Sequence, residues 1–213
     1  MHTLYYFMDP HCGWCYGFKP VMNQIRRDFQ DRLEFKLILG GMITGDRVGP
    51  VGRMSDYLRT AIPRLEEMTG VTMGESYKHQ VIEIGTLITD STPPSLAVLA
   101  MASQKPGQEF TFMETVQDRL FQDGADLNVA ESYQPVVLAN GLDWDQWLAD
   151  WKSDPVRFAF SQDVQFTQQI GVSGFPTVVL VNGNTGHLAA RGYVPYAELK
   201  ERVETWLQNQ NRS

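Results

Sequence analysis

The stretch "DPHCGWCYGFKP", residues 9–20, contains both cysteines of a 213-residue chain. Cys12 and Cys15 are separated by Gly13 and Trp14. Two thiols at this spacing can hold part of a metal site, form a structural disulfide, or exchange electrons with other thiols. The sequence on either side of the pair discriminates among these three uses.

The pair lies where an expected strand leads into an expected helix. The segment "TLYYFMD" (3–9) is rich in aromatic and β-branched residues and ends at Pro10, which predicts a short buried strand. After the pair, apolar residues recur at helical spacing: Phe18, Met22, Ile25 and Phe29. A thiol at a helix N-terminus faces unpaired N–H groups and the positive end of the helix dipole, which both favour the thiolate. We therefore expect Cys12 to be the nucleophile and Cys15, one turn further along the same face, to resolve a mixed disulfide.

Metal binding and a structural disulfide are the other two uses of such a pair. Two cysteines make half of a four-ligand zinc site, and the histidines show no paired spacing such as H-x3-5-H; they are His2, His11, His79 and His187. A disulfide that closes so short a loop constrains the unfolded chain very little, and a reducing cytosol disfavours it. We therefore expect redox exchange without a metal or an organic cofactor, because electrons can enter and leave through thiols.

Two titratable residues precede the first thiol. His11 would favour the thiolate of Cys12 if the imidazole were protonated, whereas the carboxylate of Asp9 would oppose it if it points the same way. The dipeptide Gly13-Trp14 places no imidazole between the two thiols. We therefore expect a milder oxidant than a protein with a C-P-H-C motif.

Charge and hydropathy exclude several classes of partner. The net charge of -7 and the absence of a Lys/Arg cluster argue against nucleic acid, whose backbone is also negative. No uninterrupted apolar stretch approaches the roughly 18 residues of a membrane span. The start, "MHTLYYFMDP", lacks both a basic region and an apolar region of about 7 residues, as a secretory signal would have. We expect a cytoplasmic protein with no membrane partner.

The C-terminal part of the chain supplies a second structural signature. The segment "SGFPT" (173–177) precedes an expected strand at 177–181, a Gly/Asn-rich turn, a strand at 188–193 and a helix from Tyr196. Pro176 can open a buried strand because its missing N–H need not enter the hydrogen-bond ladder. Gly174 and Phe175 beside it favour a closely approaching backbone.

Together these features resemble the thioredoxin superfamily: a strand, C-x-x-C and a helix start, Pro20 five positions after Cys15, and "SGFPT" before the last hairpin. The wider pattern "FMDPHCGWCYGFKP", followed by "LILGGM", resembles the DsbA-like family of predicted protein-disulfide isomerases, close to its FrnE-like cytoplasmic branch. The resemblance is specific over about residues 3–42 and 158–207. One departure is Tyr6, six residues before Cys12, where several relatives carry a buried acid.

The resemblance implies where a substrate binds. In this superfamily the proline equivalent to Pro176 is cis and packs beside the disulfide, and the neighbouring backbone aligns the incoming chain by a short β-like pairing. The substrate-contacting residues implied here are Pro176, Phe175, Gly174, Trp14 and His11.

The middle of the chain predicts a helical insertion. We expect an α/β, thioredoxin-like fold in which residues 1–42 and 158–213 form a discontinuous domain and residues 43–157 form an all-helical, DsbA-like insertion that caps the active site. The expected helices are 54–68, 94–104, 108–122, 129–139, 144–151 and 155–170. The stretch 40–52 is expected to be a flexible entry into the insertion, and 83–95 a loop near the motif.

Local signals support several of these helix starts. Asn128 with Glu131, and Asp143 with Gln146, resemble capping boxes, and Pro155 is expected at the first position of its helix. Trp144, Trp147 and Trp151 fall on one helical face, which favours packing in the core.

These features favour a thiol-disulfide oxidoreductase or isomerase acting on protein, peptide or small-thiol partners, with glutathione as a further redox partner. A second interpretation is a glutathione-dependent enzyme of the kappa-class transferase or 2-hydroxychromene-2-carboxylate isomerase type. Those proteins are similar in architecture and commonly carry serine in place of the first cysteine, so the presence of both cysteines argues against it. A third is a non-catalytic binding or chaperone-like protein whose helical cap grips apolar peptides.

Overall fold

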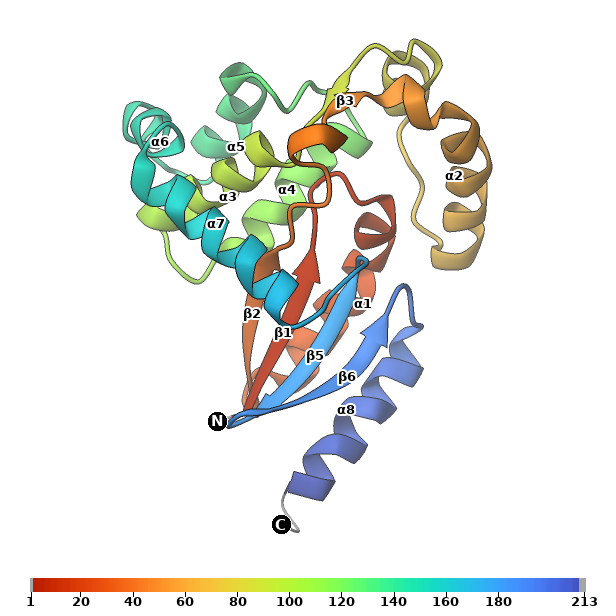
Figure 1. Cartoon of the computed structure of the whole chain (residues 1–213), viewed down its shortest axis with the longest axis vertical. Coiled ribbons are helices and arrows are strands. Elements are labelled where there is room, and N and C mark those ends of the chain that lie inside the picture. The colour runs from red at the N-terminus through yellow and green to blue at the C-terminus, as the bar shows by residue number, and fades with distance from the viewer. Residues whose placement is uncertain (1, 211–213) are drawn as a thin grey trace.

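Strand β1 (His2–Met8) lies inside a four-stranded mixed sheet with the order β2-β1-β5-β6. The computed structural model, shown in Figure 1, describes residues 2–210. β1 pairs in parallel with β2 (Leu33–Leu39) and antiparallel with β5 (Thr177–Asn182). β6 (Thr185–Arg191) completes the sheet as the second strand of a hairpin with β5.

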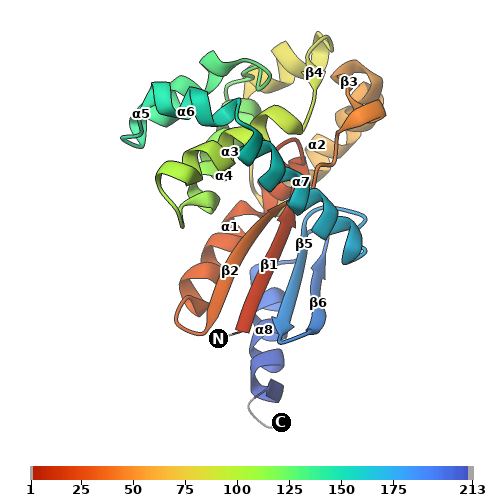
Figure 2. The ribbon, with the colours of Figure 1, turned by 60° about the vertical axis from the view of Figure 1, so that its left-hand side comes forward.

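Alternate residues of β1 face two different helical layers, as the period of a strand requires. Leu4, Tyr6 and Met8 point to the side covered by α1 (Gly13–Phe29) and α8 (Tyr196–Gln210), where they join the main core. Phe7 points to the other side, where α7 (Asp154–Gln169) lies across β2. Figure 2 shows the sheet between these layers.

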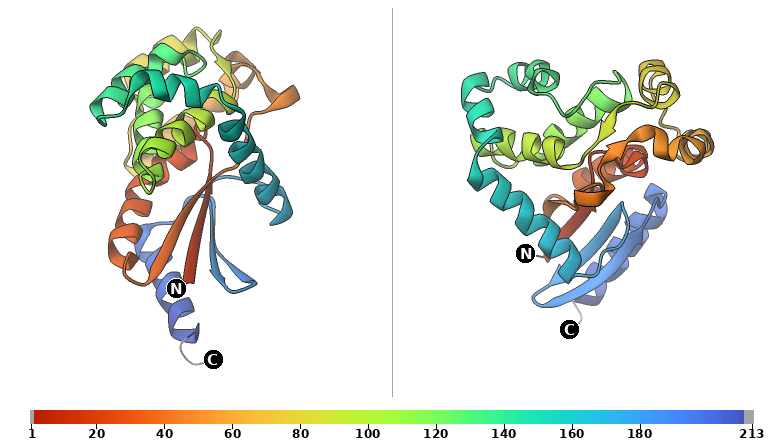
Figure 3. Two further views of the ribbon diagram at one scale, coloured as in Figure 1. Left: turned by 90° about the vertical axis from the view of Figure 1, so that its left-hand side faces the viewer. Right: turned by 45° about the horizontal axis from the view of Figure 1, so that its top comes forward.

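The chain between β2 and α7 is mostly helical and gathers beyond the carboxyl ends of β1 and β2, as the left view in Figure 3 shows. We call this part of the chain, from η1 to α6, the helical cap. Its elements are η1 (Gly45–Arg47), β3 (Gly49–Pro50), η2 (Val51–Met54), α2 (Ser55–Thr69), the π-helix η3 (Tyr77–Glu83), β4 (Ile88–Thr89), α3 (Thr92–Gln104), α4 (Glu109–Phe121), η4 (Ala130–Tyr133), α5 (Gln134–Ala139) and α6 (Trp144–Trp151).

The thioredoxin-like fold with a large helical insertion is confirmed. The expected bounds of α6 agree with the structure, and those of α7 differ by one residue at each end. Two short strands, β3 and β4, pair within the segment expected to be all helical. The division at residues 157 and 158 stays a prediction, and α7 runs continuously across it.

Two of the expected helix starts hold and one is wrong. Asp143 caps α6 by accepting the backbone N–H of Gln146 at 2.8 Å, and Pro155 lies in the first turn of α7. Asn128 caps no helix: its amide donates to the Ile88 carbonyl at 2.8 Å and to Asp126 at 2.7 Å. The side chain ties β4 to the loop after α4 instead, a tertiary contact that a local pattern cannot show.

The tryptophans of α6 pack in the core, as expected. The Trp147 ring is fully buried and stacks on Trp144 and Trp151 with ring centroids 4.9 and 5.5 Å apart. Its indole N–H donates to the Ala97 carbonyl at 3.2 Å, which satisfies the polar atom that burial would otherwise leave unpaired. Within residues 2–210, no helix has both the length and the apolar character that crossing a membrane demands.

Candidate active site at the thiol pair

Cys12 is the N-cap residue of α1, immediately after the turn that follows β1. Its backbone is extended (φ -81°, ψ 105°), and its Sγ accepts the backbone N–H of Cys15 at 3.2 Å. The backbone N–H of Cys12 donates to the Asp9 carbonyl at 3.1 Å, which closes the turn. The sulfur therefore takes the place of the oxygen that usually satisfies an orphan N–H at a helix start. This contact and the helix end place a backbone hydrogen-bond donor and the positive end of the helix dipole beside the Cys12 sulfur.

The two thiols differ in their surroundings. Both are free and buried, and the exposed fraction is 5% for Cys12 and 1% for Cys15. Burial raises the pKa of the Cys15 thiol well above its ordinary value. The hydrogen bond with Cys12 and the charge of Cys12 raise this pKa further. Cys15 is therefore held protonated behind Cys12, which is the more accessible of the two.

The loop before β5 brings Pro176 to the thiols. The Phe175–Pro176 peptide bond is cis, and the Sγ of Cys12 lies 3.5 Å from the Phe175 carbonyl oxygen, to which the thiol donates. The loop is held by Thr177, whose hydroxyl donates to the Gly174 carbonyl at 2.8 Å. Residues 163 positions apart in sequence thus meet at one sulfur atom.

The Phe175 ring rests on the backbone of Gly40, at the end of β2. A Cβ added to Gly40 would lie 2.0 Å from the Cζ atom of this ring, so no larger residue fits there without displacing it. Sequence reasoning treated this glycine only as part of a flexible stretch. In the structure it supports the residue that precedes Pro176.

Asp9 is fully buried and anchors the turn that precedes Cys12. Its carboxylate accepts the backbone N–H groups of His11 at 2.9 Å and Met42 at 2.7 Å and the hydroxyl of Ser91 at 2.8 Å. Burial raises the pKa of the Asp9 carboxyl above its usual 3.8, while His11 and the hydrogen bonds pull it down. This one side chain joins the end of β1 to the loop after β2 and to the start of α3.

His11 points into the helical cap. Its Nε2 donates to the Asp90 carbonyl at 3.0 Å, and its ring lines a small apolar pocket with Val51 and Leu58. Burial lowers the pKa of His11 below its usual 6.5, although Asp9 opposes this. A neutral imidazole at pH 7 adds no positive charge beside Cys12. Contact between His11 and a substrate stays a prediction. The hydrogen bond between His11 and Asp90 brings part of the segment 83–95 next to the motif, as expected.

Three further candidates surround Cys12 with different degrees of exposure. Trp14 and Phe175 are half-buried and pack partly against the core. A Cβ at Gly174 would meet nothing within 4 Å, so open space lies beside the loop there. This side of the site leaves room for an incoming chain, although binding by these residues stays a prediction.

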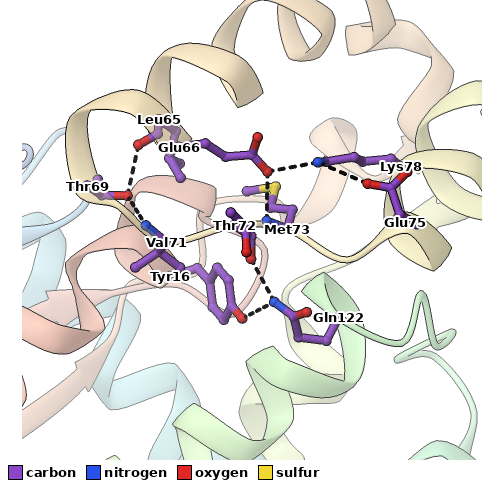
Figure 4. A network of polar contacts seen from close by, with 10 residues as sticks. All are labelled: Tyr16, Leu65, Glu66, Thr69, Val71, Thr72, Met73, Glu75, Lys78 and Gln122. Atoms are coloured by element: carbon purple, nitrogen blue, oxygen red, sulfur yellow. Dashed lines mark hydrogen bonds and ion pairs between the residues drawn. The ribbon is translucent and has the colours of Figure 1, made fainter.

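Residues 70–74, between α2 and η3, form a wall over the start of α1. A Cβ at Gly13 would lie 3.1 Å from the Met73 side chain, so the loop covers the motif closely. Figure 4 shows how the loop is held: Glu66 accepts the N–H of Met73 at 2.8 Å, and Gln122 donates to the Thr72 carbonyl at 2.7 Å. Gln122 also donates to the hydroxyl of Tyr16 at 2.6 Å, which ties the loop to α1. No sequence signal marks these contacts, because their partners lie far apart in the chain.

Other parts of the surface show no comparable chemistry. A hollow of about 700 Å³ lies over β5, β6 and the end of α7 and does not include either cysteine. Its lining is mainly apolar. Among residues 2–210, no cluster of three or more His, Cys, Asp or Glu side chains is arranged to hold a metal ion.

The fold and the thiols at a helix start, facing a cis-proline loop, define a thioredoxin-like protein of the DsbA-like type. A family model described as "Thioredoxin" matches residues 5–201, and the chain belongs to this family.

The chain is similar to several known proteins. It is 25% identical to the cytosolic disulfide reductase DsbM from Pseudomonas aeruginosa, covering 97% of this chain and 98% of that one with a TM-score of 0.76; DsbM is also solved with glutathione. A candidate protein disulfide isomerase from Nitrosomonas europaea is 24% identical over 98% of both chains, with a TM-score of 0.87. A 2-hydroxychromene-2-carboxylate isomerase shares the fold, at 14% identity over 99% of both chains and a TM-score of 0.70.

Two further relatives are described as adapter proteins. The ClpXP adapter protein SpxH from Shouchella clausii is 23% identical over 96% of this chain and 66% of its own length. The SpxH protein from Halalkalibacterium halodurans is also 23% identical, over 91% of this chain and 63% of its own length. The chain thus spans just under two thirds of the length of these curated relatives.

Proposed function

We propose that this protein is a thiol-disulfide oxidoreductase that exchanges disulfides with protein or small-thiol partners. The observation that carries the proposal is the position of Cys12, whose sulfur accepts the N–H of Cys15 and faces the carbonyl of Phe175. One sulfur that attacks and a second thiol one helical turn behind it are the two parts that this form of disulfide exchange needs.

The reaction proceeds in two exchanges. The thiolate of Cys12 attacks one sulfur of a partner disulfide, forming a mixed disulfide and releasing the other sulfur as a thiolate. Cys15 then loses its proton and attacks Cys12, forming the Cys12–Cys15 disulfide and releasing the second partner thiolate. The partner gains two electrons and the protein loses two. Reversal of the same steps oxidises a partner dithiol.

A partner chain lies beside Pro176 in an extended conformation. Backbone pairing next to Phe175 gives alignment without sequence selectivity, as in other cases of strand addition. Trp14 and the Phe175 ring add apolar contact. The reaction needs no bound cofactor, since the electron donors are thiols and the electron acceptors are disulfides.

Glutathione is a suitable small-thiol partner, and the cytoplasm is the compartment in which we place the protein. The similarity to a cytosolic disulfide reductase that has been solved with glutathione supports both points. Neither an isomerase role nor a preferred direction of electron flow is favoured by the geometry alone, because both directions use the same two thiols.

Two other functions draw support from the comparisons. Similarity in fold to 2-hydroxychromene-2-carboxylate isomerase favours a glutathione-dependent enzyme. Similarity to the ClpXP adapter protein SpxH favours a protein that binds a partner without turnover. We rank both below the redox function because neither gives a role to the buried second thiol, Cys15.

The test compares two activities and a trapping variant. The redox function requires that the protein accelerate reduction of insulin by dithiothreitol and that Cys15→Ser accumulate covalent partner adducts at Cys12. Cys12→Ser is the matched control, because it removes the attacking sulfur and leaves Cys15 in place. Conjugation of glutathione to a chromogenic electrophile, undiminished in Cys15→Ser and without insulin reduction, would favour the transferase. Binding without any adduct would favour the adapter.

A further inference from the structure

The hydroxyl of Tyr6 is a buried polar atom without a partner. Tyr6 is 4% exposed, and among the described residues its hydroxyl has no hydrogen-bond partner at ordinary distance, although it lies near enough to the Cys15 thiol for a hydrogen bond between them to raise the pKa of Tyr6. Its ring is held in place by Phe18, with centroids 6.0 Å apart, and by a stack on Phe110 of α4 at 6.1 Å. An unpaired buried hydroxyl destabilises a fold by about 1–3 kcal/mol. Such a group in a well-packed core calls for a use other than stability.

Tyr6 shares a small cavity with Cys15. The cavity lies between β1, α1 and α4, has about 10 Å³ of free space, and is lined by Tyr6, Cys15 and Glu114 together with Met8, Lys19, Met22, Phe110 and Gln117. This volume is close to what one water molecule needs. The cavity therefore places a buried thiol, an unpaired hydroxyl and a carboxyl group around a single space.

Glu114 connects this space with solvent. The side chain is partly exposed and accepts a hydrogen bond from the Asn23 amide at 3.2 Å. Burial raises the pKa of the Glu114 carboxyl, and the positive charges of Lys19 and Arg26 on α1 lower it. Asp118, one turn further along α4, raises it.

Other titratable groups also face Cys15 and Tyr6, the two most deeply buried residues of this cavity. Cys15 faces Cys12 and Asp9, whose charges raise the pKa of its thiol. Burial raises the pKa of Tyr6 well above its usual 10.0, and the thiols of Cys15 and Cys12 raise it further. Tyr6 therefore stays a neutral hydroxyl, able to donate a hydrogen bond to an ionised sulfur and to pass a proton without holding a charge.

We propose that Tyr6 and Glu114 form the proton route that serves Cys15 in the resolving step. This proposal rests on the redox function above. As Cys15 attacks the mixed disulfide, its proton moves through the Tyr6 hydroxyl, or through a water molecule that enters the cavity, to the carboxylate of Glu114 and from there to solvent. The bond between Cys15 and Cys12 forms as the bond between Cys12 and the partner breaks, and the partner leaves as a thiolate. Tyr6 donates a hydrogen bond to the sulfur while it is ionised.

The experiment uses Ellman's reagent, which reports both exchanges with one chromophore. Attack by Cys12 releases a first coloured thiolate, and resolution by Cys15 releases a second. Rapid mixing from pH 5 to 9 is carried out with wild type, Tyr6→Phe and Glu114→Gln. Glu109→Gln is the matched control, because it removes an acid from the same helix outside the cavity.

We expect the first release to be unchanged in every variant. The second release should slow by about tenfold or more at pH 7 in Tyr6→Phe and Glu114→Gln, within the range of a lost acid-base group, and not in Glu109→Gln. The wild-type rate should level off once Glu114 is ionised, whereas the rate of both variants should keep rising with hydroxide. A structural defect would instead lower the rate equally at every pH.

The outcomes separate this proposal from the one it rests on. A wild-type protein that releases no chromophore would overturn the redox function. Normal release of both chromophores by wild type, together with a wild-type second phase in Tyr6→Phe or Glu114→Gln, would overturn the proton route alone. Tyr6→Phe keeps the packed ring and removes only the hydroxyl, so the melting temperature of this variant should not fall. If it does fall, the second-phase rate of Glu114→Gln alone decides whether the proton route holds.

Discussion

Replacing Gly40 with alanine tests whether the Phe175 ring positions the loop beside Cys12. The new Cβ would lie 2.0 Å from Cζ and 2.1 Å from Cε1 of the ring. Because carbon atoms pack at about 3.5–4.0 Å, the ring must move by roughly 1.5 Å. Overpacking of this kind costs about 1–3 kcal/mol, and each kcal/mol lowers the melting temperature of a chain of this size by about 2–4 °C.

The same movement should impair activity. The Phe175 carbonyl lies 3.5 Å from the Cys12 sulfur, and a displacement of about 1 Å at a reacting centre can lower a rate by up to about 100-fold. We therefore expect Gly40→Ala to melt at a lower temperature and to reduce insulin about 10- to 100-fold more slowly. Calorimetry and the insulin assay measure the two effects.

Two companion variants make this prediction refutable. Gly174→Ala, in the same loop, places its Cβ in open space and should leave the melting temperature unchanged. In Gly40→Ala/Phe175→Ala the ring is absent, so the penalty of Gly40→Ala should largely disappear and the two single changes should not add. A wild-type melting temperature in Gly40→Ala, or strict additivity in the double variant, would refute the reasoning.

Two further predictions concern buried carboxylates. Asp9→Asn puts an amide where three donors converge, one of them the N–H of Met42, so one donor loses its acceptor. Urea unfolding should show a free energy of unfolding lower by about 1–3 kcal/mol with the same dependence on urea concentration. An unchanged unfolding midpoint would contradict this. Burial raises the pKa of Asp163 from 3.8 to about 6, so the folded chain holds this proton more tightly than the unfolded chain. The free energy of unfolding should therefore fall as the pH rises from about 4 to about 6, by up to roughly 3 kcal/mol from this group. Asp163→Asn should flatten that part of the profile, and an equal slope in both proteins would exclude this origin.

Much of the fold could be predicted because its signals are local. Aromatic and β-branched residues specify β1, and helical spacing with Asp143 as a cap specifies α6. The position of Cys12 at a helix start also follows from its immediate neighbours. The π-helix η3 and the β3–β4 pair carried no such signal, because their hydrogen bonds depend on how distant segments pack.

The amino-acid sequence by itself determined the order of strands and helices and the place of the thiols at the start of α1, since periodicity, capping and turn residues act over a few neighbouring positions. Only the tertiary structure decided what surrounds those thiols. It placed the Phe175 carbonyl over Cys12, turned His11 into the cap and set Tyr6 beside Cys15. The first two arrangements join residues 163 and 79 positions apart. All three depend on side-chain volumes and buried polar partners that no local pattern encodes.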